Sequence, residues 1–209
     1  MKDEKEPVLM DFEEFKHQEF IHHLQSCNYC QRFGIEPKSI VWGEKKAKIV
    51  QISQEPSKSV SESGIPFWDA SGRKLIKSGM KLIEWYDIGD DEFLNPNFFY
   101  ITGMAHCYSK GKEDVRRACA EKWLKQELSF LDPRLYIIIG KPAADFLFGK
   151  KEYLCEHVFE DLELNNKQAF VLPHPSGRSL WFNNNQNRAR FEDARLNDIR
   201  NAVHDAITS

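Results

Sequence analysis

Four short runs of continuous apolar residues constrain the fold of this chain more than any other feature of its sequence. They occupy residues 47–53, 97–102, 135–139 and 168–172 and are rich in β-branched and aromatic side chains. Continuous rather than alternating apolarity is typical of strands covered on both faces, as in a parallel sheet. Helical patterns accompany these runs at 11–27, 71–86, 113–131, 142–148 and 188–207. We therefore expect an α/β fold, a three-layer α/β/α sandwich with a central, mostly parallel four-stranded sheet.

Length and composition bound the domain organisation and the function classes. The chain has 209 residues, 41% of them hydrophobic, which is enough for one well-buried core. We expect a single domain over residues 1–209, with residues 1–6 as a flexible tail. No apolar stretch is long enough for a membrane span and the N-terminus is charged, so we expect a cytoplasmic monomer without a membrane segment. The net charge of −3 excludes coating nucleic acid by bulk charge but permits a local basic cleft.

Unusual residues follow each predicted strand directly. Gln54 and Glu55 follow the first strand, Gly103 ends the second, and His174 follows the fourth. In open α/β sheets, ligands bind outside the carboxyl ends of the strands. Gln54, Glu55 and His174, which are far apart in the sequence, are therefore expected to converge on one crevice.

Three side chains near this crevice are suited to chemistry on a flat ligand. The Glu55 carboxylate, held on a loop before Pro56, could orient or deprotonate a water molecule, unless it is a solvated loop glutamate. The Phe67 ring could stack on a base, unless it belongs to the core. The imidazole of His174, fixed between two prolines, could donate a hydrogen bond to a developing anion, unless it is a structural loop histidine.

The segment after His174 has the composition of a loop that contacts DNA. It combines small, cationic and apolar side chains in Ser176, Gly177, Arg178, Ser179 and Leu180. Such a loop can press against a phosphate backbone while Arg178 or Leu180 acts as a wedge in the base stack.

Four of the five cysteines are candidates for a metal centre. Cys27 and Cys30 form a Cys-x-x-Cys pair, whereas Cys107 and Cys119 are single. This spacing is atypical of a zinc ribbon, which has two such pairs, but an iron–sulfur cluster accepts irregular spacing. Independent reduced core thiols are the alternative, and Cys155 is interpreted as a packing residue.

Several short motifs occur in a fixed order along the chain. A Pro-containing loop follows the first strand, and Gly64-Ile65-Pro66-Phe67 comes next. Tyr100-Ile101-Thr102 precedes Cys107, and Cys119 lies in a helical segment. The last motif is His174-Pro175-Ser176. From Cys27 to the C-terminal helix, this set resembles the uracil-DNA glycosylase superfamily and is most similar to its iron–sulfur branch, often called family 4.

The resemblance implies a DNA glycosylase of base excision repair. Such an enzyme extrudes a nucleotide from the duplex and hydrolyses the N-glycosidic bond of uracil or another altered base. Phe67 would then stack on the extruded base, His174 would stabilise the leaving base, and residues 176–180 would enter the duplex. The resemblance also implies a [4Fe–4S] cluster, with zinc as the alternative, on Cys27, Cys30, Cys107 and Cys119.

Two positions depart from the pattern of that branch. Gly103 stands at the base-binding position where the family has an Asn that reads the uracil edge, so the identity of the excised base is left open. The loop with Gln54 and Glu55 instead resembles the Gln-Asp-Pro of the classical branch. We therefore expect Glu55 to direct the water and Gln54 to touch the base through its backbone.

Two functions other than a DNA glycosylase are also considered. A non-catalytic nucleic-acid-binding protein could retain the fold and the cluster, and the lack of a side chain at Gly103 favours it. A zinc-stabilised α/β enzyme acting on a small phosphorylated substrate is the second, but the sequence has no Gly-rich phosphate loop.

Overall fold

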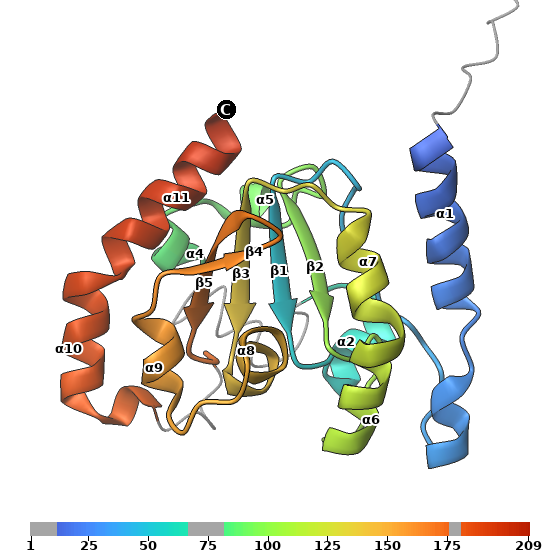
Figure 1. Cartoon of the computed structure of the whole chain (residues 1–209). Helices are drawn as coiled ribbons and strands as arrows, with labels where there is room; N and C mark the ends of the chain where they lie inside the picture. Colours follow the sequence, from blue (N-terminus) through green and yellow to red (C-terminus); the bar gives the residue numbers. More distant parts are fainter. Residues whose placement is uncertain (1–11, 67–81, 176–180) are drawn as a thin grey trace, which may run out of the picture.

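The computed structural model describes residues 12–66, 82–175 and 181–209 (Figure 1). Its centre is a sheet with the strand order β2-β1-β3-β5-β4. Among the strand pairs of the described residues, β4–β5 is antiparallel and the other three are parallel. The expected α/β fold with a mostly parallel sheet and surrounding helices is confirmed. The strands are β1 (Ile49–Ser53), β2 (Phe99–Gly103), β3 (Leu135–Ile139), β4 (Leu162–Leu164) and β5 (Lys167–Leu172).

The described sheet has five strands, so the expected number of four was wrong. The additional strand, β4, has three residues and forms a hairpin with β5. The two connecting residues, Asn165 and Asn166, have φ values of 51° and 60°. Two consecutive positive φ angles characterise the type I′ turn, whose twist matches that of a hairpin and which favours Asn. The Asn-Asn pair was therefore the sequence signal for β4, although the strand itself is too short and too exposed to stand out.

The parallel strands form the core of the protein. Every residue of β2 and β3 is buried, as are the first four residues of β1. This explains why the four runs are continuously apolar, since both faces of the sheet are covered. Gln51 is the polar residue among the four buried residues of β1, and its side-chain oxygen accepts a 2.7 Å hydrogen bond from the hydroxyl of Tyr86.

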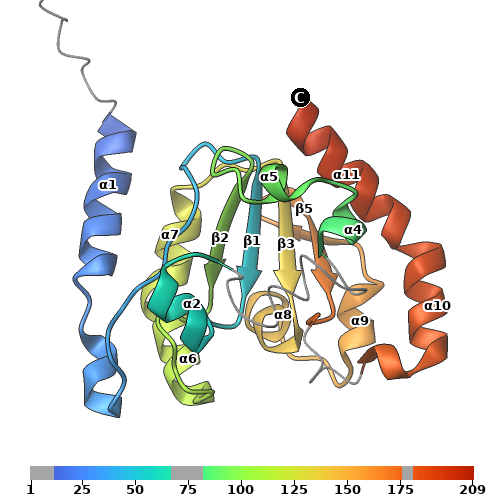
Figure 2. The same ribbon diagram turned by 180° about the vertical axis from the view of Figure 1, so that it is seen from behind.

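Helices surround the sheet (Figures 1 and 2). In both views α10 and α11 lie beside the β5 side of the sheet, α6 and α7 lie beside β2, and α1 is outermost. The helices in the described ranges are α1 (Phe12–Gln25), α2 (Lys58–Ser63), α4 (Leu82–Tyr86), α5 (Asp90–Phe93), α6 (Glu113–Cys119), α7 (Lys125–Ser129), α8 (Lys141–Phe148), α9 (Leu154–Val158), α10 (Asn185–Ala194) and α11 (Leu196–Thr208). Shorter helical turns are η1 (Tyr29–Phe33), the π-helical η2 (Ala120–Leu124) and η3 (Trp181–Asn183).

The helical expectations are met with altered boundaries. The helix expected at 113–131 comprises α6, η2 and α7, and it ends at Ser129, before the Asp-Pro pair. The helix expected at 188–207 begins earlier, because the Asn184 side chain accepts hydrogen bonds from two backbone N–H groups of the first turn, and it is interrupted at Arg195. Of the helix expected at 71–86, α4 lies within the described residues. None of the helices in the described ranges is long and apolar enough to span a membrane.

Aromatic contacts attach α1 to the rest of the molecule. The buried ring of Phe20 lies 5.9 Å from that of Trp123 and 5.2 Å from that of Phe130, measured between ring centroids. Since α1 leads directly into Cys27 and η1, this packing brings the N-terminal Cys-x-x-Cys pair towards α6.

Candidate active site

The carboxyl ends of β1, β2, β3 and β5 meet at one edge of the sheet. Ser53 at the end of β1 is in register with Gly103 at the end of β2, and Ile139 of β3 is in register with Leu172 of β5. We call this the carboxyl edge. It brings the residues that follow the strands to the same side of the sheet, as parallel pairing predicts.

Gln54 and His174 both reach the space beside Gly140 at this edge. A Cβ atom at Gly140 would lie 3.2 Å from Nε2 of Gln54, and 3.5 Å and 3.8 Å from Cβ and Cδ2 of His174. Gly140 has φ of +88°, a conformation that L side chains rarely adopt. The glycine therefore lets a side-chain amide from the residue after β1 and an imidazole from the loop after β5 approach each other across the end of β3.

The His174 loop is held firmly on both sides. Pro173 and Pro175 are buried, whereas His174 itself is half-buried. Each proline fixes its own φ angle and restricts the residue before it. The imidazole is therefore presented at the carboxyl edge with part of its surface exposed.

The carboxylate of Glu55 is engaged by the loop that follows β2. Its Oε2 accepts hydrogen bonds from the backbone N–H of Ser109, at 2.7 Å, and from the hydroxyl of the same residue. Its Oε1 accepts from the backbone N–H of Gly111, at 3.2 Å, and from Nη1 of Arg116, at 3.3 Å. A carboxylate has about four acceptor positions, so these four donors occupy all of them. The arrangement suits a residue that fixes the loop at 109–112 and leaves no acceptor position for a water molecule.

We expect Glu55→Gln to destabilise the fold, because the amide loses the charge and offers one oxygen instead of two. Hydrogen bonds to charged groups contribute about 1.5–3 kcal/mol each, and we expect a loss of about 2 kcal/mol in the free energy of unfolding. Denaturant titration measures it, with Glu121→Gln, which breaks an exposed pair with Arg117, as the matched control at about 0–1 kcal/mol. Unchanged stability together with abolished activity would instead assign the water-directing role to Glu55.

Gly103 lies where the chain passes close to β1. A Cβ atom there would be 3.3 Å from the backbone oxygens of both Ser53 and Ala105. The backbone N–H groups of Met104 and Ala105 donate to the carbonyls of Ser53 and Gln54, at 2.9 Å and 3.0 Å, which holds the two segments together. A side chain at 103 would thus require these backbone oxygens to shift by a few tenths of an ångström, and the backbone oxygen of Gln54 already has a partner.

Two groups of expected site residues lie outside the described residues. These are Phe67, expected to stack on a base, and the expected DNA-contacting loop of Ser176, Gly177, Arg178, Ser179 and Leu180.

The four candidate cysteines converge beside α6. Cys30 of η1 and Cys107 of the loop after β2 belong to one buried cluster with Ile35 and Val115. Burial, and then the negative charges of the thiolates at 119, 107 and 27, raise the pKa of Cys30 to about 12, so each of these three sulfurs is close enough to Cys30 to interact with it electrostatically. Within the described ranges, however, no group of three or more His, Cys, Asp or Glu side chains is arranged to hold a metal ion. Cys155 lies apart from them on α9.

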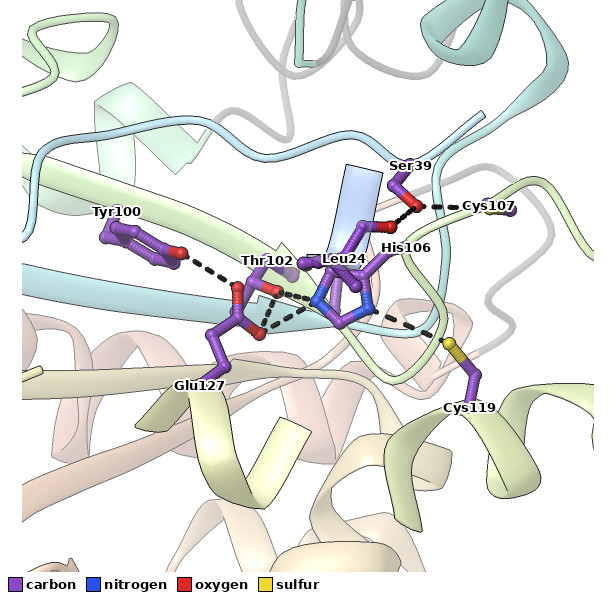
Figure 3. Close-up of polar contacts among 9 residues, drawn as sticks. Leu24, Ser39, Tyr100, Thr102, His106, Cys107, Cys119 and Glu127 are labelled. Carbon is purple, nitrogen blue, oxygen red and sulfur yellow. Dashed lines mark hydrogen bonds and ion pairs between the residues drawn. The ribbon is translucent and has the colours of Figure 1, made fainter. Parts of the chain in front are cut away.

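A buried polar network connects this cysteine group to β2 (Figure 3). The carboxylate of Glu127, which is 0% exposed, accepts hydrogen bonds of 2.9 Å from the hydroxyls of Tyr100 and Thr102. Nε2 of His106 lies 2.8 Å from Oε2 of the same carboxylate, and its Nδ1 lies 3.7 Å from the sulfur of Cys119. Burial is the largest single influence and disfavours the charged imidazole, but the Glu127 carboxylate and the Cys119 sulfur together outweigh it and raise the pKa of His106 to about 10.

Sequence reasoning missed Glu127. The available signal was that Tyr100 and Thr102, two residues apart on β2, must point to the same face of the sheet with their polar groups. Two buried hydroxyls on one face require an acceptor, which a helix packed on that face can supply.

A comparison with protein families shows that the family model described as the uracil DNA glycosylase superfamily matches residues 40–200 of this chain. Since the match covers more than half of the chain, the protein belongs to this superfamily. The matched residues include Gln54, Gly103, Gly140 and His174, whose segments converge at the carboxyl edge. They exclude Cys27 and Cys30, so the match does not decide between the branches of the superfamily.

Proposed function

We propose that the protein is a DNA glycosylase that removes uracil or another altered base from DNA, acting as a monomer in the cytoplasm. The observation that supports this most is the approach of Gln54 and His174 across Gly140, at the edge of the sheet where α/β folds bind ligands. An amide and a half-buried imidazole are suitable partners for the polar edge of an extruded base.

The proposed reaction breaks the bond between the base nitrogen and C1′ of the sugar. The base leaves with the bonding electron pair, so negative charge grows on it while the sugar becomes cationic. A water molecule then adds its oxygen to C1′ and releases a proton, and uptake of a proton neutralises the base anion, so that the products are the free base and an abasic sugar. His174 donates a hydrogen bond to the base as that charge develops, which stabilises the transition state more than the ground state. Phe67 stacks on the base, and residues 176–180 enter the duplex and contact phosphates.

Glu55 requires a modified role within this proposal. Its four hydrogen-bond donors favour a positioning function for the loop after β2, and directing the water would require at least one of them to be released. This same observation favours the second candidate function, a nucleic-acid-binding protein that retains the fold without the chemistry.

We also propose that Cys27, Cys30, Cys107 and Cys119 hold a [4Fe–4S] cluster, as in the iron–sulfur branch of the superfamily. The convergence of the four thiols supports it. A single zinc ion binds thiolates at about 2.3 Å and so needs them within about 4 Å of one another, whereas a cubane cluster spans a larger gap. Such a cluster would supply a structural cross-link between η1, the loop after β2 and α6.

Purified protein is expected to contain about four iron atoms per chain and to absorb light at about 400 nm. Cys119→Ser should lose both, whereas Cys155→Ser should keep both, because Cys155 lies apart from the group. Two results would contradict the cluster. One is zinc in a stoichiometric amount. The other is protein that contains no metal after either aerobic or anaerobic purification and is nevertheless stably folded.

The function itself is tested with oligonucleotides that contain a single uracil, hypoxanthine or xanthine. Single- and double-stranded forms are incubated with the protein, and alkali then cleaves the strand at any abasic site. Site-specific cleavage supports the glycosylase. Binding without cleavage of any substrate would favour the non-catalytic alternative.

A further inference from the structure

We propose that the docking of α1 on the rest of the molecule is controlled by pH through His17. The helix is docked while the imidazole is neutral and is released when the imidazole takes up a proton. Because α1 leads directly into Cys27 and Cys30, its release also loosens the segment that carries this pair. The inference goes beyond base excision and depends on neither the proposed activity nor the proposed cluster.

One face of α1 packs against the rest of the molecule. His17, Phe20 and Leu24 lie three and four residues apart, which places them on the same side of a helix, and all three are buried. His22 and His23 of the same helix are exposed. Both views show α1 as the outermost helix (Figures 1 and 2). Docking of the helix therefore depends on this one buried face.

His17 is the polar member of the buried face. Its ring centroid lies 5.8 Å from that of Phe130 and 6.4 Å from that of Tyr100. Its Nδ1 and Nε2 are both shielded from solvent, and neither has a hydrogen-bond partner among the described residues. A charged imidazole in this place would lose its strong hydration and gain no hydrogen bond in return. The docked helix therefore accommodates the neutral form of His17 and disfavours the charged form.

Charged groups reach His17 from three parts of the chain. These are Glu14 of α1, Glu44 and Lys45 of the segment before β1, and Glu127 of α7. Burial is the largest influence and lowers the pKa of His17 from its ordinary value of 6.5. The three carboxylates act in the opposite direction, whereas Lys45 acts with burial. The net direction is the one that the buried, unpaired nitrogens predict.

The sign of the pH dependence follows from this lowered pKa. When α1 is released, His17 meets water and regains its ordinary pKa of 6.5. Above that pH the imidazole is neutral in both states, so pH has no effect through it. As the pH falls below that value, the released helix takes up a proton that the docked helix refuses, and docking weakens. The weakening is at most about tenfold per pH unit and ends once the pH passes the lowered pKa of the docked state.

The last turn of α1 connects the helix to the cysteine group (Figure 3). The carbonyl of Leu24 accepts the backbone N–H of Cys27 at 3.2 Å and the hydroxyl of Ser39 at 2.8 Å. The same hydroxyl lies 3.6 Å from the sulfur of Cys107. Leu24 and Ser39 thus link the N-terminal pair to the loop after β2. A released α1 removes the Leu24 carbonyl from this link, so η1 is held less firmly.

The test is hydrogen–deuterium exchange of the full chain at about pH 7.5 and about pH 5.5, on either side of the ordinary histidine pKa. Exchange rates are divided by the intrinsic rates, which themselves depend on pH, to give protection factors. We expect the protection of α1 to fall several-fold at the lower pH, by no more than roughly 10-fold. The protection of η1 should fall with it, while that of β3 is kept.

Three results would count against the inference. A change in α1 protection of less than about twofold would overturn it. Equal losses in α1 and β3 would also overturn it, because they report unfolding of the whole molecule rather than release of one helix. A loss in α1 with unchanged η1 would overturn the coupling to the cysteine pair.

Substitutions on α1 assign the effect to one imidazole. His17→Phe keeps an aromatic ring beside Tyr100 and Phe130 but takes up no proton, so its α1 protection should be the same at both pH values. His22→Phe makes the same change at an exposed position and should keep the wild-type pH dependence. If the phenylalanine does not dock at the higher pH, His17→Leu repeats the test with a smaller apolar side chain. A docked His17 variant that loses α1 protection as wild type does would overturn the inference.

Discussion

Replacement of His174 by alanine is expected to slow base excision by about 10²- to 10³-fold, the effect of removing one donor that faces a developing anion. The group acts on charge that appears only as the glycosidic bond lengthens. The loss should therefore fall on kcat, with little change in KM. The fold should survive, since the buried prolines on both sides of His174 remain.

Single-turnover kinetics on a uracil duplex measure the effect, with thermal unfolding as the check on the fold. His174→Asn should recover part of the rate, because its side-chain NH2 is also a hydrogen-bond donor. A folded His174→Ala variant within threefold of the wild-type rate would remove the imidazole from the mechanism. The leaving base would then need another donor.

The largest effect on stability is expected from Glu127→Leu. Glu127 is fully buried and accepts from Tyr100, Thr102 and His106. Its removal leaves two hydroxyls and an imidazole without their shared acceptor in a dry environment. Breaking a buried charged pair costs about 3–5 kcal/mol, which corresponds to a fall in Tm of roughly 10 °C in a protein of this size.

Thermal and denaturant unfolding measure this loss. His106→Leu in the same protein should restore part of the stability, because the uncompensated imidazole is then absent as well. A Glu127→Leu variant within 1 kcal/mol of wild type would contradict the network of Figure 3. Glu19→Leu on α1, where the carboxylate is exposed, provides the comparison and should change stability by less than about 1 kcal/mol.

Strand positions were predictable from sequence because strands that are buried on both faces consist of continuous runs of apolar residues. The run at 135–139 coincides with β3, and the run at 168–172 lies within β5. The convergence of Gln54 and His174 followed from one general rule, since parallel strands deliver their carboxyl ends to one edge. β4 has no comparable run of apolar residues, because a three-residue edge strand needs only one apolar face.

The direction of individual side chains was not predictable. Glu55 follows β1 as expected, but its carboxylate turns to donors that lie more than fifty residues further along the chain. Glu127 lies in a helical pattern where a glutamate normally faces solvent. Only the packing of α7 on the face of β2 that carries Tyr100 buries it. Such contacts depend on tertiary geometry that local patterns do not encode.

The central claim is that one edge of the sheet accommodates an extruded base and releases it from the sugar. The most direct measurement is the formation of abasic sites by wild-type protein on a duplex with a single uracil, compared with the same duplex containing cytosine. The account predicts alkali-sensitive cleavage at the uracil position and none at cytosine. Intact strands from both duplexes, and from the hypoxanthine and xanthine duplexes, at protein concentrations that saturate binding would contradict it.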